Sequence, residues 1–148
     1  MNEMNKMKLD IGCGNNKKEG FLGVDIFQNP QVDYVMSATN LNFDSNSIEE
    51  IYSRRCIQHI KDDKKALNEM YRVLQKDGKL TLIVASWRGW LYYKLRWVFQ
   101  KKTYDCFNLY TKKKLVKMLK DAGFKHVLFD MLGTGFLKED FFVVCIKN

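Results

Sequence analysis

A pair of glycines between two short apolar runs constrains the fold of this chain most. The first run and its glycines read MKLDIGCG (residues 7–14), and the second run, FLGVDI (21–26), follows after only six residues. A Gly-x-Gly directly after a strand usually lets a nucleotide-like ligand approach the backbone. The six intervening residues are too few for the crossover helix that normally joins two parallel strands. A simple turn is the alternative interpretation.

Two common phosphate-binding sites do not fit this glycine pair. The dinucleotide fingerprint needs a third glycine three residues after the second, where a helix begins and holds the pyrophosphate. Here that position is Lys17. A phosphate-binding P-loop needs a Gly-Lys-Ser/Thr sequence after the loop, and none follows. The pattern therefore disfavours a dinucleotide or a nucleoside triphosphate as ligand.

Apolar runs and amphipathic stretches alternate along the rest of the chain, as they do in α/β proteins. Asp62 offers an N-cap for a helix with apolar residues at helical spacing, and Gly78 is predicted to stop that helix. A second helix is predicted between Thr111 and Gly123. Strands are predicted at residues 7–11, 21–26, 32–37, 48–53, 79–85, 125–130 and 141–146.

These elements predict an α/β fold with a three-layer, Rossmann-like sheet of about seven strands. The sheet should be mostly parallel, with the last strand antiparallel, because only the short connection 133–140 joins it to the strand before. The early crossover helices are expected to be trimmed. We expect a single domain, residues 1–148, with an aromatic and basic cap insertion at about 87–110.

Charge and cysteine content narrow the class of protein. The net charge is +8, and residues 87–126 hold eleven Lys and Arg against two Asp and Glu. Such a patch attracts nucleic acid, anionic lipid or an acidic substrate, unless it is only a solvated helix face. The four cysteines are widely spaced without a CxxC pair. This spacing favours separate reduced thiols, so neither disulfides nor a metal site is expected.

The expected location of the protein is cytoplasmic. No apolar stretch reaches the roughly 20 residues that span a bilayer. The N-terminal residues lack the apolar region of a secretion signal and run directly into a predicted strand. Peripheral contact at the inner face of the membrane is a further expectation, because the late insertion mixes Trp and Tyr with Lys and Arg.

Two carboxylates at the ends of the first two predicted strands indicate the ligand. Asp10 precedes the glycines, and Asp25 ends the second run. Because the carboxyl ends of parallel strands face the same crevice, both side chains are expected there. A carboxylate accepts two hydrogen bonds from a ribose diol, and another can hold an ammonium group. The pair suits a cationic nucleoside without phosphate, and S-adenosylmethionine has that combination. Strand-end caps are the plainer interpretation of either residue alone.

Five stretches in a fixed order carry a family resemblance that covers most of the chain. The chain resembles class I, Rossmann-like S-adenosylmethionine-dependent methyltransferases of the small "type 11-like" group. The stretches are LDIGCG, VDI, SATNLNFDSNSIEEIYSRRCIQHI, ALNEMYRVLQKDGKLTLIV and YTKKKLVKMLKDAGF. The resemblance implies an enzyme with S-adenosylmethionine as its cofactor.

The resemblance also assigns cofactor contacts to residues of this sequence. Asp25 would bind the ribose hydroxyls and Ile26 would pack on the adenine. Ser37 and Ala38 fall where relatives have an Asp-Ala pair at the adenine edge, and serine replaces the carboxylate here. The methionine end would be lined by Gly12, Cys13 and Gly14, with Asp10 close by, and flanked by Arg55 and Cys56. Gln58 departs from the commoner glutamate.

The catalytic residue expected from the sequence is His59, near the start of the helical stretch after the fourth strand. Imidazole titrates near neutral pH and could take a proton from the methyl acceptor. A structural role for His59 is the alternative. Cys56 lacks the Pro-Cys context of the enzymes that methylate pyrimidines at carbon 5 through a thiolate. The Asp/Asn-Pro-Pro-aromatic motif of methyltransferases that act on nucleic-acid amino groups is also absent.

The aromatic and basic insertion is expected to bind the methyl acceptor. Trp87, Arg88 and Trp90 follow the fifth predicted strand at the carboxyl edge of the sheet. They suit a small molecule or a lipid-linked, cell-envelope acceptor, although burial against the core would explain the aromatic residues equally well. The alternative function is a non-catalytic module that binds RNA or a protein partner through this segment. Nucleic acid is the less favoured partner, and the oligomeric state is open.

Overall fold

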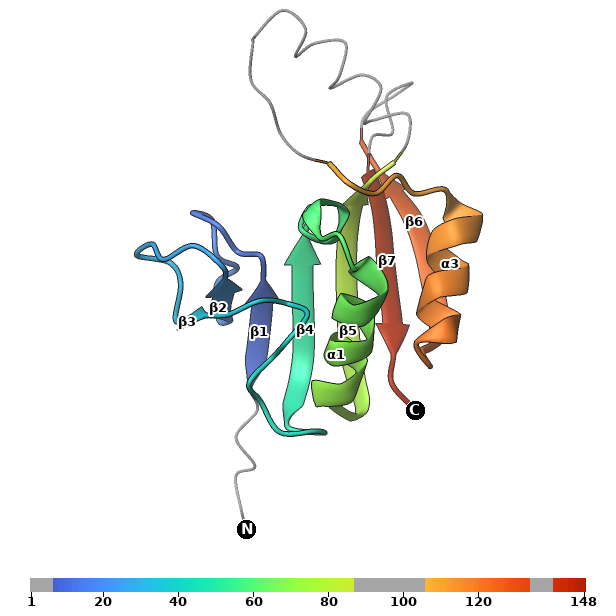
Figure 1. Ribbon diagram of the computed structural model, residues 1–148. Helices are drawn as coiled ribbons and strands as arrows, with labels where there is room; N and C mark the ends of the chain where they lie inside the picture. The colour runs from blue at the N-terminus through green and yellow to red at the C-terminus, as the bar shows by residue number, and fades with distance from the viewer. Residues whose placement is uncertain (1–6, 87–105, 134–139) are drawn as a thin grey trace, which may run out of the picture.

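The computed structural model describes residues 7–86, 106–133 and 140–148, which form one twisted sheet with helices packed against it (Figure 1). The helical elements are the 3₁₀ helix η1 (Ile57–His59), α1 (Asp63–Val73) and α3 (Lys112–Asp121). The strands are β1 (Lys8–Ile11), β2 (Leu22–Asp25), β3 (Tyr34–Val35), β4 (Ile48–Arg54), β5 (Leu74–Ala85), β6 (Lys125–Leu132) and β7 (Asp140–Ile146).

The seven strands lie in the order β3-β2-β1-β4-β5-β7-β6. The pairs among β1 to β5 are parallel, and β7 runs antiparallel to both of its neighbours. The predicted α/β sheet, mostly parallel with an antiparallel last strand, is therefore confirmed. In this order the carboxyl ends of β1, β2 and β4 meet at one edge of the sheet, where a parallel sheet holds its ligands.

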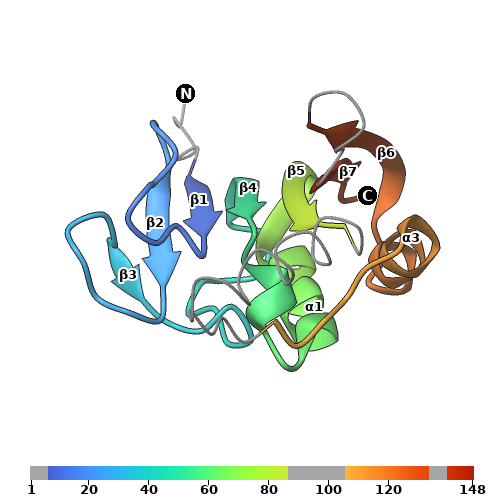
Figure 2. The same cartoon turned by 90° about the horizontal axis from the view of Figure 1, so that it is seen from above.

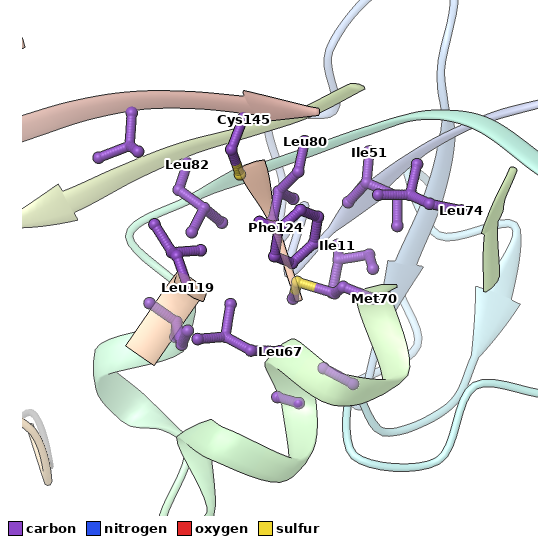
Figure 3. Packing of buried hydrophobic residues seen from close by; sticks show 14 of the residues in the cluster. Ile11, Ile51, Leu67, Met70, Leu74, Leu80, Leu82, Leu119, Phe124 and Cys145 are labelled. Carbon is purple, nitrogen blue, oxygen red and sulfur yellow. The ribbon is translucent and has the colours of Figure 1, made fainter. Parts of the chain in front are cut away.

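The core lies between the sheet and the two α-helices. Apolar residues at every second position of the strands point toward the helices, as the two-residue period of a strand requires. Figure 3 shows Leu67 and Met70 of α1 packed among strand residues, with Phe124 filling the space after α3. The labelled strand residues in this cluster are Ile11, Ile51, Leu74, Leu80, Leu82 and Cys145.

Within the described residues, both α-helices lie on the same face of the sheet (Figure 2). The second helical layer of the predicted three-layer arrangement is not seen in these parts of the chain. Only short loops join β1 to β2 and β2 to β3, so the expectation of trimmed crossover helices agrees with the structure. The β1–β2 loop covers part of β1 and β4. Its Lys18 backbone amide donates a hydrogen bond to Asp10 of β1, and its Phe21 ring packs edge-on against Tyr52 of β4.

One predicted helix boundary is wrong. α1 ends at Val73 rather than continuing toward Gly78, and β5 begins at Leu74, five residues before the predicted strand. Tertiary contacts set this boundary. The buried ammonium of Lys147 donates to the carbonyls of Tyr71 (2.7 Å) and Leu74 (2.7 Å), and the Lys147 backbone pairs with Asp77 and Gly78.

The third strand is also shorter than predicted, with only Tyr34 and Val35 in the sheet. It lies at the sheet edge, where a single neighbour, β2, is available for pairing. Among the described helices, none has the length and apolar character needed to cross a membrane.

Candidate cofactor site

A cavity of about 710 Å³ opens at the carboxyl edge of β1, β2 and β4. Its size falls within the range usual for small-molecule and cofactor sites, roughly 300–1,000 Å³. Four chain segments, one after each of the first four strands, build its walls. They contribute Ile11, Gly12, Gly14, Val24, Asp25, Ile26, Phe27, Met36, Ser37, Ala38, Thr39, Arg55, Cys56, His59, Ile60, Lys61 and Asp62.

The glycine loop directs its amides into the protein. The Gly12 nitrogen donates to the Val24 carbonyl at 2.7 Å, the Cys13 nitrogen lies 3.4 Å from the same oxygen, and the Gly14 nitrogen donates to Asp25 at 2.9 Å. Phosphate-binding loops need such amides free and pointing at the anion. The Gly12, Cys13 and Gly14 amides are therefore not free to bind a phosphate, in agreement with the absence of a third glycine.

Asp25 lines the cavity and keeps acceptor capacity. Its Oδ2 accepts from the Gly14 amide at 2.9 Å, and its Oδ1 accepts from the Phe27 amide at 3.1 Å. An ionised carboxylate has about four acceptor positions, so these two bonds leave room for a diol. The two backbone bonds fix the orientation of the carboxylate at the end of β2.

Asp10 and Cys13 do not line the cavity. Asp10 is 2% exposed, and its Oδ2 accepts from the Lys18 amide at 2.7 Å. Burial raises the pKa of its carboxyl, while the Lys18 amide and nearby cations oppose the rise. In this structure Asp10 anchors the β1–β2 loop. Cys13 is buried, and burial raises the pKa of its thiol to about 11. Contact of either residue with a cofactor remains a prediction.

The wall formed by the ends of β2 and β3 is largely apolar. Ile26 and Phe27 are 58% and 73% exposed beside the cavity, an arrangement that a flat ring could cover. Ser37 and Ala38, which follow β3, also line the cavity. The Ser37 hydroxyl lies 2.8 Å from the Thr39 hydroxyl and also accepts from the Thr39 amide, so a polar pair replaces the carboxylate expected from relatives.

Cys56 lies directly against the glycine loop. A Cβ atom on Gly12, whose φ is +74°, would overlap the Cys56 side chain, so both backbone conformation and space require glycine there. Burial raises the pKa of the Cys56 thiol to about 12, with the Asp25 charge acting in the same direction. The thiol is neutral at physiological pH, which argues against a thiolate nucleophile.

Arg55 lines the cavity, and its guanidinium is ion-paired. Its Nε donates to Asp140 Oδ2 at 2.9 Å and its Nη2 donates to Asp140 Oδ1 at 3.1 Å. Arg55 therefore ties the loop after β4 to the first residue of β7. A role for Arg55 beside the methionine moiety remains a prediction.

His59 ends the short helix η1 and reaches the rim of the cavity with its side chain exposed. This is a suitable place for a proton acceptor. Its neighbour Gln58 is buried, and the Gln58 Oε1 accepts from the Ala85 amide of β5 at 3.2 Å. Gln58 is thus a structural link between η1 and the sheet.

The structure adds wall residues that the sequence interpretation missed. They are Ile11, Val24, Phe27, Met36, Thr39, Ile60, Lys61 and Asp62. Phe27 follows Ile26 directly, and its apolar character at a strand end was the available signal. Ile11 and Val24 belong to β1 and β2, Thr39 and Ile60 fall within a stretch that carries the family resemblance, and Asp62 is the N-cap of α1. The predicted acceptor residues Trp87, Arg88 and Trp90 lie outside the described residues.

Comparison with known proteins identifies the family. The family model described as a methyltransferase domain, of type 11, matches residues 9–82, half of the chain. The chain belongs to this family. The resemblance to class I S-adenosylmethionine-dependent methyltransferases is therefore confirmed.

Related proteins agree with this methyltransferase assignment. Phosphoethanolamine N-methyltransferase 2 of Caenorhabditis elegans is 35% identical over 48 residues, which are 32% of this chain and 11% of that protein. The similarity thus spans about a tenth of the length of that relative. Each of the solved structures below is at most 20% identical, so its likeness shows the fold alone.

Three solved structures share the fold over nearly the whole chain. The possible histamine N-methyltransferase of Thermotoga maritima has a TM-score of 0.74 at 20% identity, covering 96% of this chain and 82% of its own. Phosphoethanolamine N-methyltransferase 2 of Haemonchus contortus, in complex with S-adenosyl-L-methionine, has a TM-score of 0.71 at 18% identity. The match covers 96% of this chain and 48% of that protein. A putative methyltransferase of Bacillus halodurans has a TM-score of 0.70 at 16% identity, and the match covers 98% of this chain and 94% of that protein.

Proposed function

We propose that this methyltransferase binds S-adenosylmethionine in the cavity around Asp25 and methylates a small-molecule acceptor. The observation that carries the proposal is the pairing of Asp25 with the glycine loop. A carboxylate lies where a phosphate-binding loop would offer free amides, and the amides of that loop bond internally. This arrangement repels a phosphate and suits the ribose of a cationic nucleoside.

Different residues around the cavity would contact different parts of the cofactor. Asp25 would accept hydrogen bonds from the ribose hydroxyls, and Ile26 and Phe27 would cover the adenine. The glycine loop and Cys56 would adjoin the methionine end. When bound, S-adenosylmethionine supplies an electrophilic methyl group, and the protein contributes alignment and water exclusion. His59 at the rim would accept the proton that the acceptor loses.

The acceptor that relatives favour is a small amine. Three of the similar proteins are named as N-methyltransferases, two of phosphoethanolamine and one, as a possible activity, of histamine. Lys61 at the rim of the cavity would attract the phosphate of an acceptor such as phosphoethanolamine. A lipid-linked acceptor and contact with the membrane surface are the less supported alternatives, because their predicted residues lie outside the described parts of the chain.

Calorimetric titration with S-adenosylmethionine tests the cofactor site. The Asp25→Asn variant should weaken binding roughly 10- to 100-fold, the worth of a hydrogen bond to a charged group. Glu19→Gln is a matched control, since it removes an exposed carboxylate from the β1–β2 loop without touching the cavity. No heat of binding for the unchanged protein at millimolar cofactor would reject the proposal and favour the non-catalytic module.

Transfer of a labelled methyl group tests the acceptor. Phosphoethanolamine, histamine, total lipid extract and RNA would be offered separately with labelled S-adenosylmethionine. Label in either amine would support the proposal, whereas label only in lipid or RNA would assign the acceptor to another class. His59→Gln should lower the rate with little change in cofactor affinity, because the side chain lies at the rim.

A further inference from the structure

A segment far along the chain holds the helix that forms one wall of the cofactor cavity. Residues 106–110, which we call the strap, cross the edge of the sheet beside η1. The Phe107 and Asn108 backbone amides donate to the Gln58 carbonyl at 2.9 and 3.1 Å. The Asn108 side-chain amide donates to the Ile60 carbonyl at 2.7 Å. About fifty residues separate the strap from η1 in sequence, so this contact exists only in the folded protein.

The short helix η1 needs such support. It has three residues, its N-cap residue Cys56 makes no side-chain cap, and 3₁₀ turns of this length have poor hydrogen-bond geometry. The carbonyls at its C-terminal end would otherwise be satisfied by water. The strap accounts for two of them, at Gln58 and Ile60. The hydrogen bonds from the strap therefore help to fix the position of η1.

Tyr110 anchors the strap from below. It is fully buried, and its hydroxyl donates to Asp63 Oδ2 at 2.7 Å, with the Ile57 carbonyl a second acceptor at 3.4 Å. Its backbone pairs with Ser86, the residue after β5. Burial raises the pKa of the Tyr110 hydroxyl far above its ordinary value, so it remains a donor at every usable pH. Strap, η1 and the start of α1 thus form one bonded unit.

The unit matters because η1 and its flanks supply cavity wall. Three residues of this region line the cavity: Cys56, His59 and Ile60. The strap binds the carbonyl of Ile60 itself, and it binds the carbonyls of Ile57 and Gln58, which are the neighbours of Cys56 and His59 in the sequence. A shift of η1 would move the proposed base and the wall beside the glycine loop together. The strap itself supplies no residue to that wall among the described residues.

We propose that Asn108 and Tyr110 are positioning residues of the cofactor site. They hold η1 in the arrangement that binds the cofactor and places His59 at the rim. The effect on cofactor binding rests on the proposed function, but the support that the strap gives to η1 can be tested without a cofactor. Without the side-chain bond of Asn108, η1 would populate other positions, and apparent affinity falls in proportion to the population of the competent state.

The first measurement is hydrogen exchange of the amides of residues 57–62 in the cofactor-free protein. Asn108→Ala should speed exchange there about fivefold, the factor that one net hydrogen bond is worth. Tyr110→Phe should do the same at η1 and at the first turn of α1. Asn42→Ala, at an exposed asparagine away from η1, should leave these amides unchanged. Unaltered exchange at 57–62 in both strap variants would overturn the proposal.

The second measurement separates positioning from general stability. Asn108→Ala should raise the dissociation constant of S-adenosylmethionine about fivefold. Met118→Ala, in the core face of α3, should lower the unfolding midpoint at least as much and leave cofactor affinity unchanged. Equal affinity losses in both variants would overturn the inference. A protein that does not bind the cofactor at all would reject the proposed function, while the exchange measurement would still decide on the strap.

Discussion

The backbone amide of Gly14 donates a hydrogen bond to the carboxylate of Asp25, with 2.9 Å between the nitrogen and Oδ2. This bond joins the glycine loop after β1 to the end of β2. It uses an amide that a phosphate site would need free, and it leaves the carboxylate beside the cavity. We therefore expect the pairing of these two residues to favour a nucleoside without phosphate.

Nucleoside selection follows from this pairing. S-adenosylhomocysteine and adenosine should compete with S-adenosylmethionine, whereas AMP should bind at least about tenfold more weakly than adenosine, because its phosphate meets a carboxylate and no free amides. The check is a competition titration with each compound. The 2′-deoxy form of adenosine should also lose affinity, since one ribose hydroxyl is missing. AMP binding as tightly as adenosine would contradict the assignment of the glycine loop.

Gly12 and Gly14 should respond differently to alanine. Both have positive φ, but only at Gly12 would the new Cβ overlap the Cys56 side chain. We expect Gly14→Ala to lower the free energy of unfolding by about 1–2 kcal/mol, and Gly12→Ala by about 2–5 kcal/mol. Urea denaturation measures both. Adding Cys56→Gly to Gly12→Ala should recover part of the larger loss, and no recovery would show that the overlap is not its cause.

The buried carboxyl of Asp10 should make stability depend on pH. Because its folded pKa is raised, its favourable contribution is complete below the unfolded value of 3.8 and is lost as pH rises through the folded pKa. Asp10→Asn keeps an acceptor for the Lys18 amide without the buried charge. At pH 7 the free energy of unfolding of this variant should equal or exceed that of the unchanged protein.

The pH series for Asp10→Asn also tests the role that the sequence predicts. The stability difference between variant and unchanged protein should shrink as the pH approaches 4. If Asp10 only anchors the loop, cofactor affinity should stay within about twofold of the unchanged protein. A much weaker cofactor affinity would instead support the predicted contact at the methionine end.

Lys147 should be essential for the end of α1. Its buried ammonium donates to the Tyr71, Arg72 and Leu74 carbonyls and to Asn46. Lys147→Met leaves these acceptors without a partner, which should lower the free energy of unfolding by about 2–4 kcal/mol. Lys76→Met, at an exposed lysine nearby, should change it by less than about 0.5 kcal/mol. Thermal or urea denaturation of the two variants checks the contrast.

Local patterns in the sequence were enough to predict most of the sheet. The alternating and continuous apolar runs predicted all seven strands, and Asp62 and Thr111 cap the two α-helices as expected, accepting from the Lys65 and Lys114 amides. Capping and periodicity are local properties, so they are readable without knowledge of the fold. The end of α1 was not readable, because the residue that caps it, Lys147, lies more than seventy positions away.

The amino-acid sequence by itself determined the family, the glycine loop without a phosphate site and the carboxylate of Asp25, because these depend on residue types at short spacing. Only the tertiary structure decided which predicted residues meet. It turns Asp10 away from the cavity into a loop anchor and brings Cys56 against Gly12. It also places the strap of residues 106–110 against η1. Contacts between distant segments depend on how the strands are ordered in the sheet, and that order is a property of the whole chain.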